Sequence, residues 1–119
     1  MTDLNKVLFT GILTHDLELY CTSEGIKIVN LRIAIHRKYK TKSNEIKLET
    51  NFVTVVVWKT LAEICAKYLK KGSKVLVEGR LKTREYVDKN QQKRNNLEIQ
   101  AENIQFLNPL NIQRNKDEI

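Results

Sequence analysis

The chain has 119 residues, of which 41% are hydrophobic, so its length and composition predict one domain with a real core. Its formal net charge of +7 favours an anionic partner, either a nucleic acid or an acidic membrane surface. No stretch reaches the roughly 20 apolar residues of a membrane span, and the N-terminus carries no basic and apolar leader. We therefore expect a soluble intracellular protein with no membrane partner.

The positive charge belongs to the first 107 residues. In residues 108–119, the cations Arg114 and Lys116 are balanced by the anions Asp117 and Glu118. A basic folded body indicates a shaped binding surface, whereas a basic tail would indicate a disordered arm. We therefore divide the chain into a folded binding domain at residues 1–107 and a short flexible C-terminal tail at residues 108–119.

Three strands are predicted in the first half of the chain. Residues 5–13 form the first strand, with Gly11 as a bulge or bend. Residues 26–36 form a long strand after a turn at 23–25, because apolar and polar side chains alternate along them. Residues 39–48 are polar and rich in lysine, which predicts a loop. Residues 52–58 are β-branched and predict a third strand.

One helix is predicted at residues 60–71. Thr60 and Glu63 have the spacing of an N-terminal capping box. Gly72 suits the position just after the C-terminus. One face of the helix is apolar and expected to pack on the core, and it comprises Leu61, Ile64, Cys65, Tyr68 and Leu69.

Residues 74–86 (KVLVEGRLKTREY) predict a fourth strand with two different faces, because alternate side chains of a strand point to opposite sides. The face expected to be buried comprises Val75, Val77, Gly79 and Leu81. The opposite face carries three cations and a ring in one row: Arg80, Lys82, Arg84 and Tyr86. The polar residues 88–96 then predict a hairpin tip, and a fifth strand begins at residues 97–101 and extends toward 107.

The order of these elements predicts an all-β domain. Three strands, a helix and two further strands are the plan of the OB-fold, a five-stranded Greek-key barrel with one helix between strands 3 and 4.

Aromatic side chains are the candidate contacts to bases. A single-stranded nucleic acid is bound by cations that contact phosphates and by rings that stack on bases. The valine face of residues 52–58 suits the core, which leaves Phe52 and Trp58 outward. There a nucleobase, a second subunit, or a loop or the helix of the same chain would cover them. Tyr39 lies among the cations of residues 36–42, and Tyr86 ends the basic row.

Candidate phosphate contacts come from three separate elements that folding would have to bring together. They are Arg32, Arg37, Lys38, Lys40, Lys42, Arg80, Lys82, Arg84, Lys93 and Arg94. Stacking on ring faces does not read the identity of a base, so we expect little sequence preference.

Catalytic and metal-binding patterns are not recognisable in the sequence. There is no G-x-x-x-x-G-K-[ST] nucleotide loop. Cys21 and Cys65 are too far apart for a C-x-x-C pair, so we interpret Cys65 as a small core residue and Cys21 as incidental. Asp16 with Glu18 comes nearest to the acid cluster that a metal-dependent nuclease needs. We therefore expect a non-catalytic protein without a cofactor or a metal site.

Four stretches of the chain together resemble the bacterial and mitochondrial single-stranded-DNA-binding protein family: NKVLFTGIL, GIKIVNLRIAIHRK, TNFVTVVVWKTLAE and YLKKGSKVLVEGRLKTREY. The resemblance implies an OB domain that assembles as a homotetramer and binds and protects single-stranded DNA in replication, recombination and repair. It also implies base stacking at four aromatic positions, which fall on Tyr39, Phe52, Trp58 and Tyr86. A cytoplasmic, nucleoid-associated location follows from the family, with an organelle matrix as the alternative.

The sequence departs from the family pattern at several points. Leu17 stands where the family usually has proline, and of the four ring positions only Trp58 is tryptophan. Family members end in an acidic tip that recruits replication and repair proteins. Here Asp117 and Glu118 are the only acids near the end, so the resemblance implies a weak or absent tip.

Three functional readings remain, and they differ in their partners. The first is a single-strand binder, which rings at all four stacking positions favour. The second is an OB-fold replication-restart adaptor of the primosomal type, a dimer that bridges DNA and proteins. The third is a nuclease or another nucleic-acid enzyme on an OB barrel, which the lack of an acid cluster disfavours.

Residues 5–13 also predict self-association, because apolar side chains occupy both faces of that strand. One face can meet the barrel, and the other needs a partner subunit unless the helix or the tail covers it.

Overall fold

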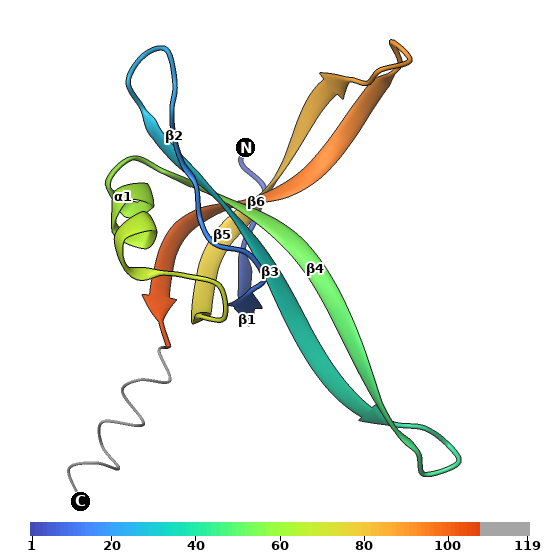
Figure 1. The fold of residues 1–119 in the computed structure, drawn as a ribbon. Helices are drawn as coiled ribbons and strands as arrows, with labels where there is room; N and C mark the ends of the chain where they lie inside the picture. The colour runs from blue at the N-terminus through green and yellow to red at the C-terminus, as the bar shows by residue number, and fades with distance from the viewer. Residues whose placement is uncertain (108–119) are drawn as a thin grey trace, which may run out of the picture.

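The computed structural model describes residues 1–107 as a small β-barrel with one helix and with long hairpins that project from it (Figure 1). The elements in chain order are β1 (Val7–Leu13), β2 (Leu19–Cys21), β3 (Lys27–Lys40), β4 (Ile46–Trp58), α1 (Lys59–Tyr68), β5 (Lys74–Val87) and β6 (Lys93–Phe106).

Five of the strands close on themselves. The sheet order is β1-β5-β6-β4-β3-β2, and β1 also pairs with β3, so the chain of neighbours β1-β5-β6-β4-β3 returns to β1. The predicted five-stranded barrel, with its helix before the strand at Lys74–Val87, is therefore confirmed. The short strand β2 was not predicted. It pairs antiparallel with β3 at the rim and adds three exposed residues to the sheet.

The barrel core is made by the faces that period-two alternation predicted. Valine, leucine and isoleucine side chains at odd positions of β3, β4 and β5 are fully buried: Val29, Leu31, Ile33, Val55, Val57, Val75 and Val77. Because odd-numbered residues of these strands face the core, even-numbered residues face outward. A register shift of one residue would exchange the two faces.

Gly11 lies where β1 passes from one partner strand to the other. Its neighbours Val7–Ile12 pair with β5, whereas Ile12 and Leu13 pair with β3. A Cβ atom at Gly11 would lie 2.8 Å from the carbonyl oxygen of Ala34, so only glycine allows β3 to approach. The sequence predicted a bulge or a bend at Gly11, and the bulge is excluded because the pairing with β5 continues through this residue. The register shift lies instead between Glu78 and Gly79 of β5.

Two hairpins extend well beyond the barrel as arms (Figure 1). The β3–β4 arm is paired from Ile28↔Trp58 to Lys40↔Ile46, so the expected loop at residues 39–48 is wrong and the chain reverses only at residues 41–45. The β5–β6 arm is paired to Val87↔Lys93, which narrows the expected tip at residues 88–96 to 88–92. Cross-strand pairing outweighs the low β-propensity of the Lys and Asn residues in both arms.

The second arm ends in a turn that one carboxylate holds together. Asp88 Oδ1 accepts hydrogen bonds from the backbone N–H groups of Asn90 (2.9 Å) and Gln92 (3.0 Å), and Oδ2 accepts from Arg94 Nε at 2.9 Å. The bond from Gln92, with that from Arg94, lowers the pKa of Asp88 from its ordinary value. The Arg94 side chain is therefore bound to the Asp88 carboxylate at the end of this arm.

Helix α1 differs from the prediction at both ends. β4 runs directly into it, so Thr60 lies within the first turn and Trp58 occupies the cap position without a side-chain hydrogen bond. The predicted capping box is therefore wrong. The helix ends at Tyr68, and Gly72 serves a following turn, which the Ser73 N–H closes by donating to the Lys70 carbonyl at 3.0 Å. Its φ of 93° explains the glycine.

The buried face of α1 is narrower than the predicted apolar face. Ala62 and Cys65 of the helix are buried, as is Leu69 just after its end, whereas Ile64 and Tyr68 are exposed. The small side chains Ala62 and Cys65 belong to the buried core and let the helix lie close to the barrel.

The two thiols have the environments that the sequence predicted. Cys65 is buried, and that burial raises its pKa to about 11, so it stays protonated at neutral pH and behaves as a small core residue. Cys21 is exposed at the rim. Within residues 1–107, no helix is long and apolar enough to cross a membrane.

Replacing Gly11 by alanine should lower the free energy of unfolding by roughly 1–3 kcal/mol, because the new methyl group must displace the backbone of β3. Thr10→Ala, an exposed change on the same strand, should stay within about 0.5 kcal/mol. Urea unfolding at one protein concentration measures both variants. Equal stability of the two would show that β3 does not constrain β1.

Candidate nucleic-acid interface

The outward face of β3 and β4 carries rings and polar groups in register. Cross-strand partners share a face, and the even-numbered pairs point away from the core. From the rim toward the arm these pairs are Ile28↔Trp58, Asn30↔Val56, Arg32↔Thr54 and Ala34↔Phe52. The predicted outward placement of Phe52 and Trp58 is confirmed, with Phe52 56% exposed and Trp58 half-buried.

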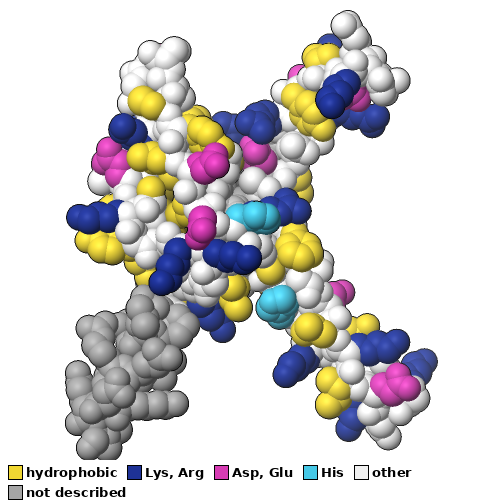
Figure 2. Space-filling model, in the orientation of Figure 1, with side chains coloured by type: hydrophobic (Ala, Val, Ile, Leu, Met, Phe, Trp, Pro, Cys, Tyr) yellow, Lys and Arg dark blue, Asp and Glu magenta, His cyan; other side chains and the backbone are white. Residues whose placement is uncertain are grey.

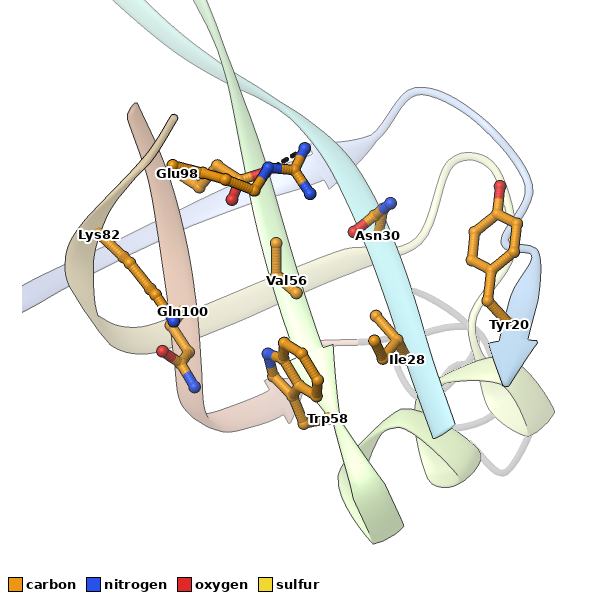
Figure 3. Close-up of a pocket in the computed structure, with 9 residues that line it drawn as sticks. Tyr20, Ile28, Asn30, Val56, Trp58, Lys82, Glu98 and Gln100 are labelled. Atoms are coloured by element: carbon orange, nitrogen blue, oxygen red, sulfur yellow. Dashed lines mark ion pairs between the residues drawn. The ribbon is translucent and has the colours of Figure 1, made fainter. Parts of the chain in front are cut away.

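A cavity of about 370 Å³ opens beside Trp58 on this face (Figure 3). Its apolar surface is formed by Trp58, Val56, Ile28 and Tyr20. Such a volume lies within the roughly 300–1,000 Å³ of small-molecule sites. A flat ring beside an open apolar hollow is the arrangement that a stacked base requires.

Polar side chains complete this Trp58 cavity from the neighbouring strands. Asn30 comes from β3, Glu98 and Gln100 come from β6, and Lys82 and Arg84 come from β5 (Figure 3). The cavity therefore combines an apolar floor, groups that can bond a base edge and two cations within reach of a phosphate.

Tyr20 is the ring that the sequence reasoning missed. It lies on β2 opposite Ile28, is exposed and borders the Trp58 cavity. Its hydroxyl donates a hydrogen bond to Glu18 Oε2 at 2.9 Å, and this bond raises the Tyr20 pKa. The short apolar run at residues 19–21, ahead of the turn at 23–25, was the available signal for a rim hairpin.

A second cavity, of about 470 Å³, lies between the barrel face and the β5–β6 arm. Phe52 and Leu97 line it together with Leu81, which was expected to be buried but is exposed. The prediction for Leu81 is wrong because β5 leaves the barrel after the register shift at Gly79. The Arg32 guanidinium carbon lies 5.7 Å from the Phe52 ring centroid, so a cation and a ring are side by side here.

Arg84 and Glu98 form an ion pair between the two cavities. Arg84 Nη2 lies 3.3 Å from Glu98 Oε2, and both residues line both cavities. The Arg84 side chain is 63% exposed, whereas that of Glu98 is only 12% exposed. The Arg84 guanidinium thus faces solvent, and the Glu98 carboxylate is part of the wall of the two cavities. Arg80, next along the strand, donates a hydrogen bond to Gln100 at 3.3 Å.

Tyr39 lies on the opposite face of the β3–β4 arm from the other rings. Its register partner is Lys47, and its odd position places it on the face of β3 that continues the core side. The Arg37 guanidinium carbon lies 5.7 Å from the Tyr39 ring centroid, and Arg37 also pairs with Glu49 at 3.8 Å. The sequence could not reveal this, because it predicted a loop at Tyr39.

The remaining predicted residues lie along the arms. Lys38 and Lys40 share the outward face with exposed Leu48 and Ile46, and Lys42 lies in the turn. Tyr86 is exposed near the far end of the other arm, where its cross-strand partner is Arg94. Lys93 is also at this end. Figure 2 shows Lys and Arg side chains gathered at the ends of both arms, with hydrophobic side chains among them.

The acidic residues nearest to a nuclease pattern have structural partners. Asp16 Oδ1 accepts a hydrogen bond from the Lys71 N–H at 2.8 Å, which ties the segment after β1 to the turn that follows α1. Glu18 accepts from Tyr20. In the described part of the chain, no three His, Cys, Asp or Glu side chains gather as a metal site.

Comparison with known proteins gives one consistent result. A family model described as the single-strand binding protein family matches residues 4–107. Single-stranded DNA-binding protein of Halalkalibacterium halodurans is 42% identical over 107 residues, which are 89% of this chain and 62% of the relative. Single-stranded DNA-binding protein A of Bacillus subtilis is 41% identical over 108 residues, 91% of this chain and 62% of the relative. The chain therefore spans 62% of the length of these two relatives.

Solved structures agree with the sequence comparison. A Plasmodium falciparum SSB in complex with ssDNA matches with a TM-score of 0.83 at 26% identity, over 91% of this chain and 98% of that chain. A deletion mutant of the single-stranded DNA binding protein from Thermus aquaticus matches with a TM-score of 0.77 at 28% identity, over 87% of this chain and 50% of that chain.

Proposed function

The chain belongs to the single-strand binding protein family, and from this premise we propose that it binds and protects single-stranded DNA without catalysing a reaction on it. Its place would be in replication, recombination and repair, in the cytoplasm of a bacterium with the nucleoid. The observation that carries the proposal is the outward barrel face, where Trp58 borders an open apolar cavity with Lys82 and Arg84 beside it.

Three rings are proposed to stack on bases from this side of the molecule. Trp58 and Phe52 border neighbouring cavities on the barrel, and Tyr86 lies farther along the outward face of the β5–β6 arm. Each stacked base would contribute about 1–3 kcal/mol. Tyr39 is proposed as a fourth contact of smaller weight, because the strand must pass around the β3–β4 arm to reach it.

Cations on the same face are proposed to follow the phosphates. Arg32, Lys82 and Arg84 border the cavities, and Lys38 and Lys40 continue this row along the β3–β4 arm. All five arginines of the predicted set have protein partners with which a phosphate would compete: Arg32, Arg37, Arg80, Arg84 and Arg94. Lys42 and Lys93 lie at the arm ends and would contact only a strand that extends that far.

We also propose that the chain assembles as a homotetramer, beginning at β1. Residues 7–11 of β1 pair with β5 on one side, and the pairing with β3 on the other side involves only Ile12 and Leu13. Leu8, on this strand, is 64% exposed. A strand with an unpaired edge and an exposed apolar side chain favours pairing with a second copy. The C-terminal residues Asp117 and Glu118, where a weak or absent acidic tip is expected, lie outside the described residues.

Single strands should bind more tightly than duplexes of equal length, because stacking requires unpaired bases. The test is a titration of Trp58 fluorescence with oligo-dT and with a matched duplex. The single strand should quench the emission. The slope of log K against log[salt] should be about −0.7 for each phosphate neutralised. Equal affinity for the duplex, or a flat salt response, would contradict the proposed function.

Trp58→Ala should weaken binding of oligo-dT by roughly 5- to 160-fold, which corresponds to the loss of one stacked base. Tyr39→Ala should weaken it less, since Tyr39 lies on the other face of its arm. Tyr68→Ala is the matched control, because this exposed ring lies on α1 outside both cavities. Fluorescence anisotropy of labelled DNA measures all three. An effect of Tyr68→Ala as large as that of Trp58→Ala would remove the proposed site.

Light scattering at micromolar concentration should give a mass near four times the chain mass of 13.9 kDa. Leu8→Glu should shift the assembly toward smaller species, because it places a charge on the exposed side of β1. A monomer mass for the unmodified chain would reject the assembly. A mass near twice 13.9 kDa would instead favour the primosomal-type adaptor.

A further inference from the structure

Glu98 is an unexpected side chain for a surface that binds phosphates. It lines both cavities of the outward face, in a domain that carries the whole +7 charge of the chain. A carboxylate at such a position repels phosphate. Its side chain is 12% exposed, so it belongs to the wall of the site and not to its solvated rim.

The carboxylate keeps accepting capacity toward the Trp58 cavity. Its contact within residues 1–107 is the 3.3 Å ion pair from one oxygen, Oε2, to Arg84, and no described N–H or O–H group donates a hydrogen bond to it. An ionised carboxylate accepts hydrogen bonds through both oxygens and donates none. Arg84 is largely exposed and therefore available to a phosphate outside, whereas Glu98 presents an acceptor inside.

Base edges differ in what they offer to such an acceptor. Cytosine carries an exocyclic amino donor, whereas thymine has a carbonyl acceptor at the equivalent position. A carboxylate favours the first and repels the second. Asn30, which also lines the cavity, has an amide that can donate or accept, whereas Gln100 accepts from Arg80 through its oxygen and keeps its N–H groups to donate. Lys82 and Arg84 in the lining can only donate, so Glu98 is the group that favours an amino donor over a carbonyl.

Resting on the proposed single-strand binding, we propose that Glu98 is a specificity-determining residue of the Trp58 cavity. It accepts a hydrogen bond from the exocyclic amino group of the stacked base and thereby shifts the preference at this subsite from thymine toward cytosine. Stacking on the Trp58 ring itself does not depend on which base is bound. The overall preference is the sum of this contact and of the intrinsic stacking and flexibility of each strand.

The test compares oligo-dC with oligo-dT of one length, within the roughly 4–16 nucleotides that one OB-fold covers. Kd is measured by fluorescence anisotropy at fixed salt for wild type, Glu98→Gln and Glu85→Gln. Glu85→Gln is the matched control: it removes the same charge from the same pair of strands, β5 and β6, at an exposed position outside both cavities. Each protein gives a ratio of Kd for oligo-dT to Kd for oligo-dC. Comparing this ratio between proteins cancels the difference in intrinsic stacking and flexibility of the two oligomers.

In wild type, the ratio of Kd for oligo-dT to Kd for oligo-dC should exceed that of Glu98→Gln by about three- to tenfold. The glutamine can turn an N–H group toward thymine, which removes the discrimination. Glu85→Gln should leave the ratio unchanged. If the ratio of the two Kd values is equal in all three proteins and binding is intact, the role assigned to Glu98 is overturned and the proposed function is not. Failure of wild type to bind either oligomer would instead contradict the proposed function.

A second measurement needs no variant, in case Glu98→Gln does not fold. Wild type is titrated with an oligomer of 2-pyrimidinone deoxynucleotides, in which cytosine lacks its 4-amino group. Its Kd should be about three- to tenfold weaker than that for oligo-dC, because the donor to Glu98 is lost. Equal affinity for the two oligomers would overturn the proposal.

Discussion

Closure of the barrel by β1 is the constraint on which the rest of the structure depends. This strand pairs with β5 along Val7–Ile12 and with β3 at Ile12 and Leu13, and Gly11 allows the close approach between them. Closure brings β4 alongside β6, where only Val55↔Ile99 and Val56↔Gln100 are paired. That short parallel contact sets Gln100 and Glu98 of β6 next to Trp58 and Val56 of β4, and the Trp58 cavity exists because of it.

Beyond this closed region the two hairpins are held by their own pairing and little else. Their residues are mostly exposed, and both arms end in charged tips (Figure 2). Segments with few buried contacts open at low free energy cost, so the arms are expected to adapt to a bound strand while the barrel does not. The register shift at Gly79 starts this divergence, since β5 turns away from the core there and exposes Leu81.

The sequence could predict what depends on neighbours along the chain. Alternation in residues 29–33, 55–57 and 75–77 identified the core faces and, with them, the outward Phe52 and Trp58. It could not predict what depends on distant partners. Strand β2 has only three residues and exists because β3 pairs with it, so Tyr20 was missed. The arms were predicted as loops because their composition is polar. Without a strand at Tyr39, alternation could not be applied there, so its place on the opposite face of the arm from the other rings was not predicted.

The outward surface has two regions that differ in rigidity and in exposure, the arms and the closed barrel. Cations on the arms are exposed and screened by salt, so they can supply affinity that does not depend on sequence. Trp58 and Glu98 lie on the closed barrel, and Glu98 is mostly withdrawn from water. Screening is weaker there, so a hydrogen bond to a base edge retains more of its strength. A protein with little overall sequence preference can therefore still discriminate bases at one subsite, provided that the discriminating group belongs to the barrel wall and not to the arms.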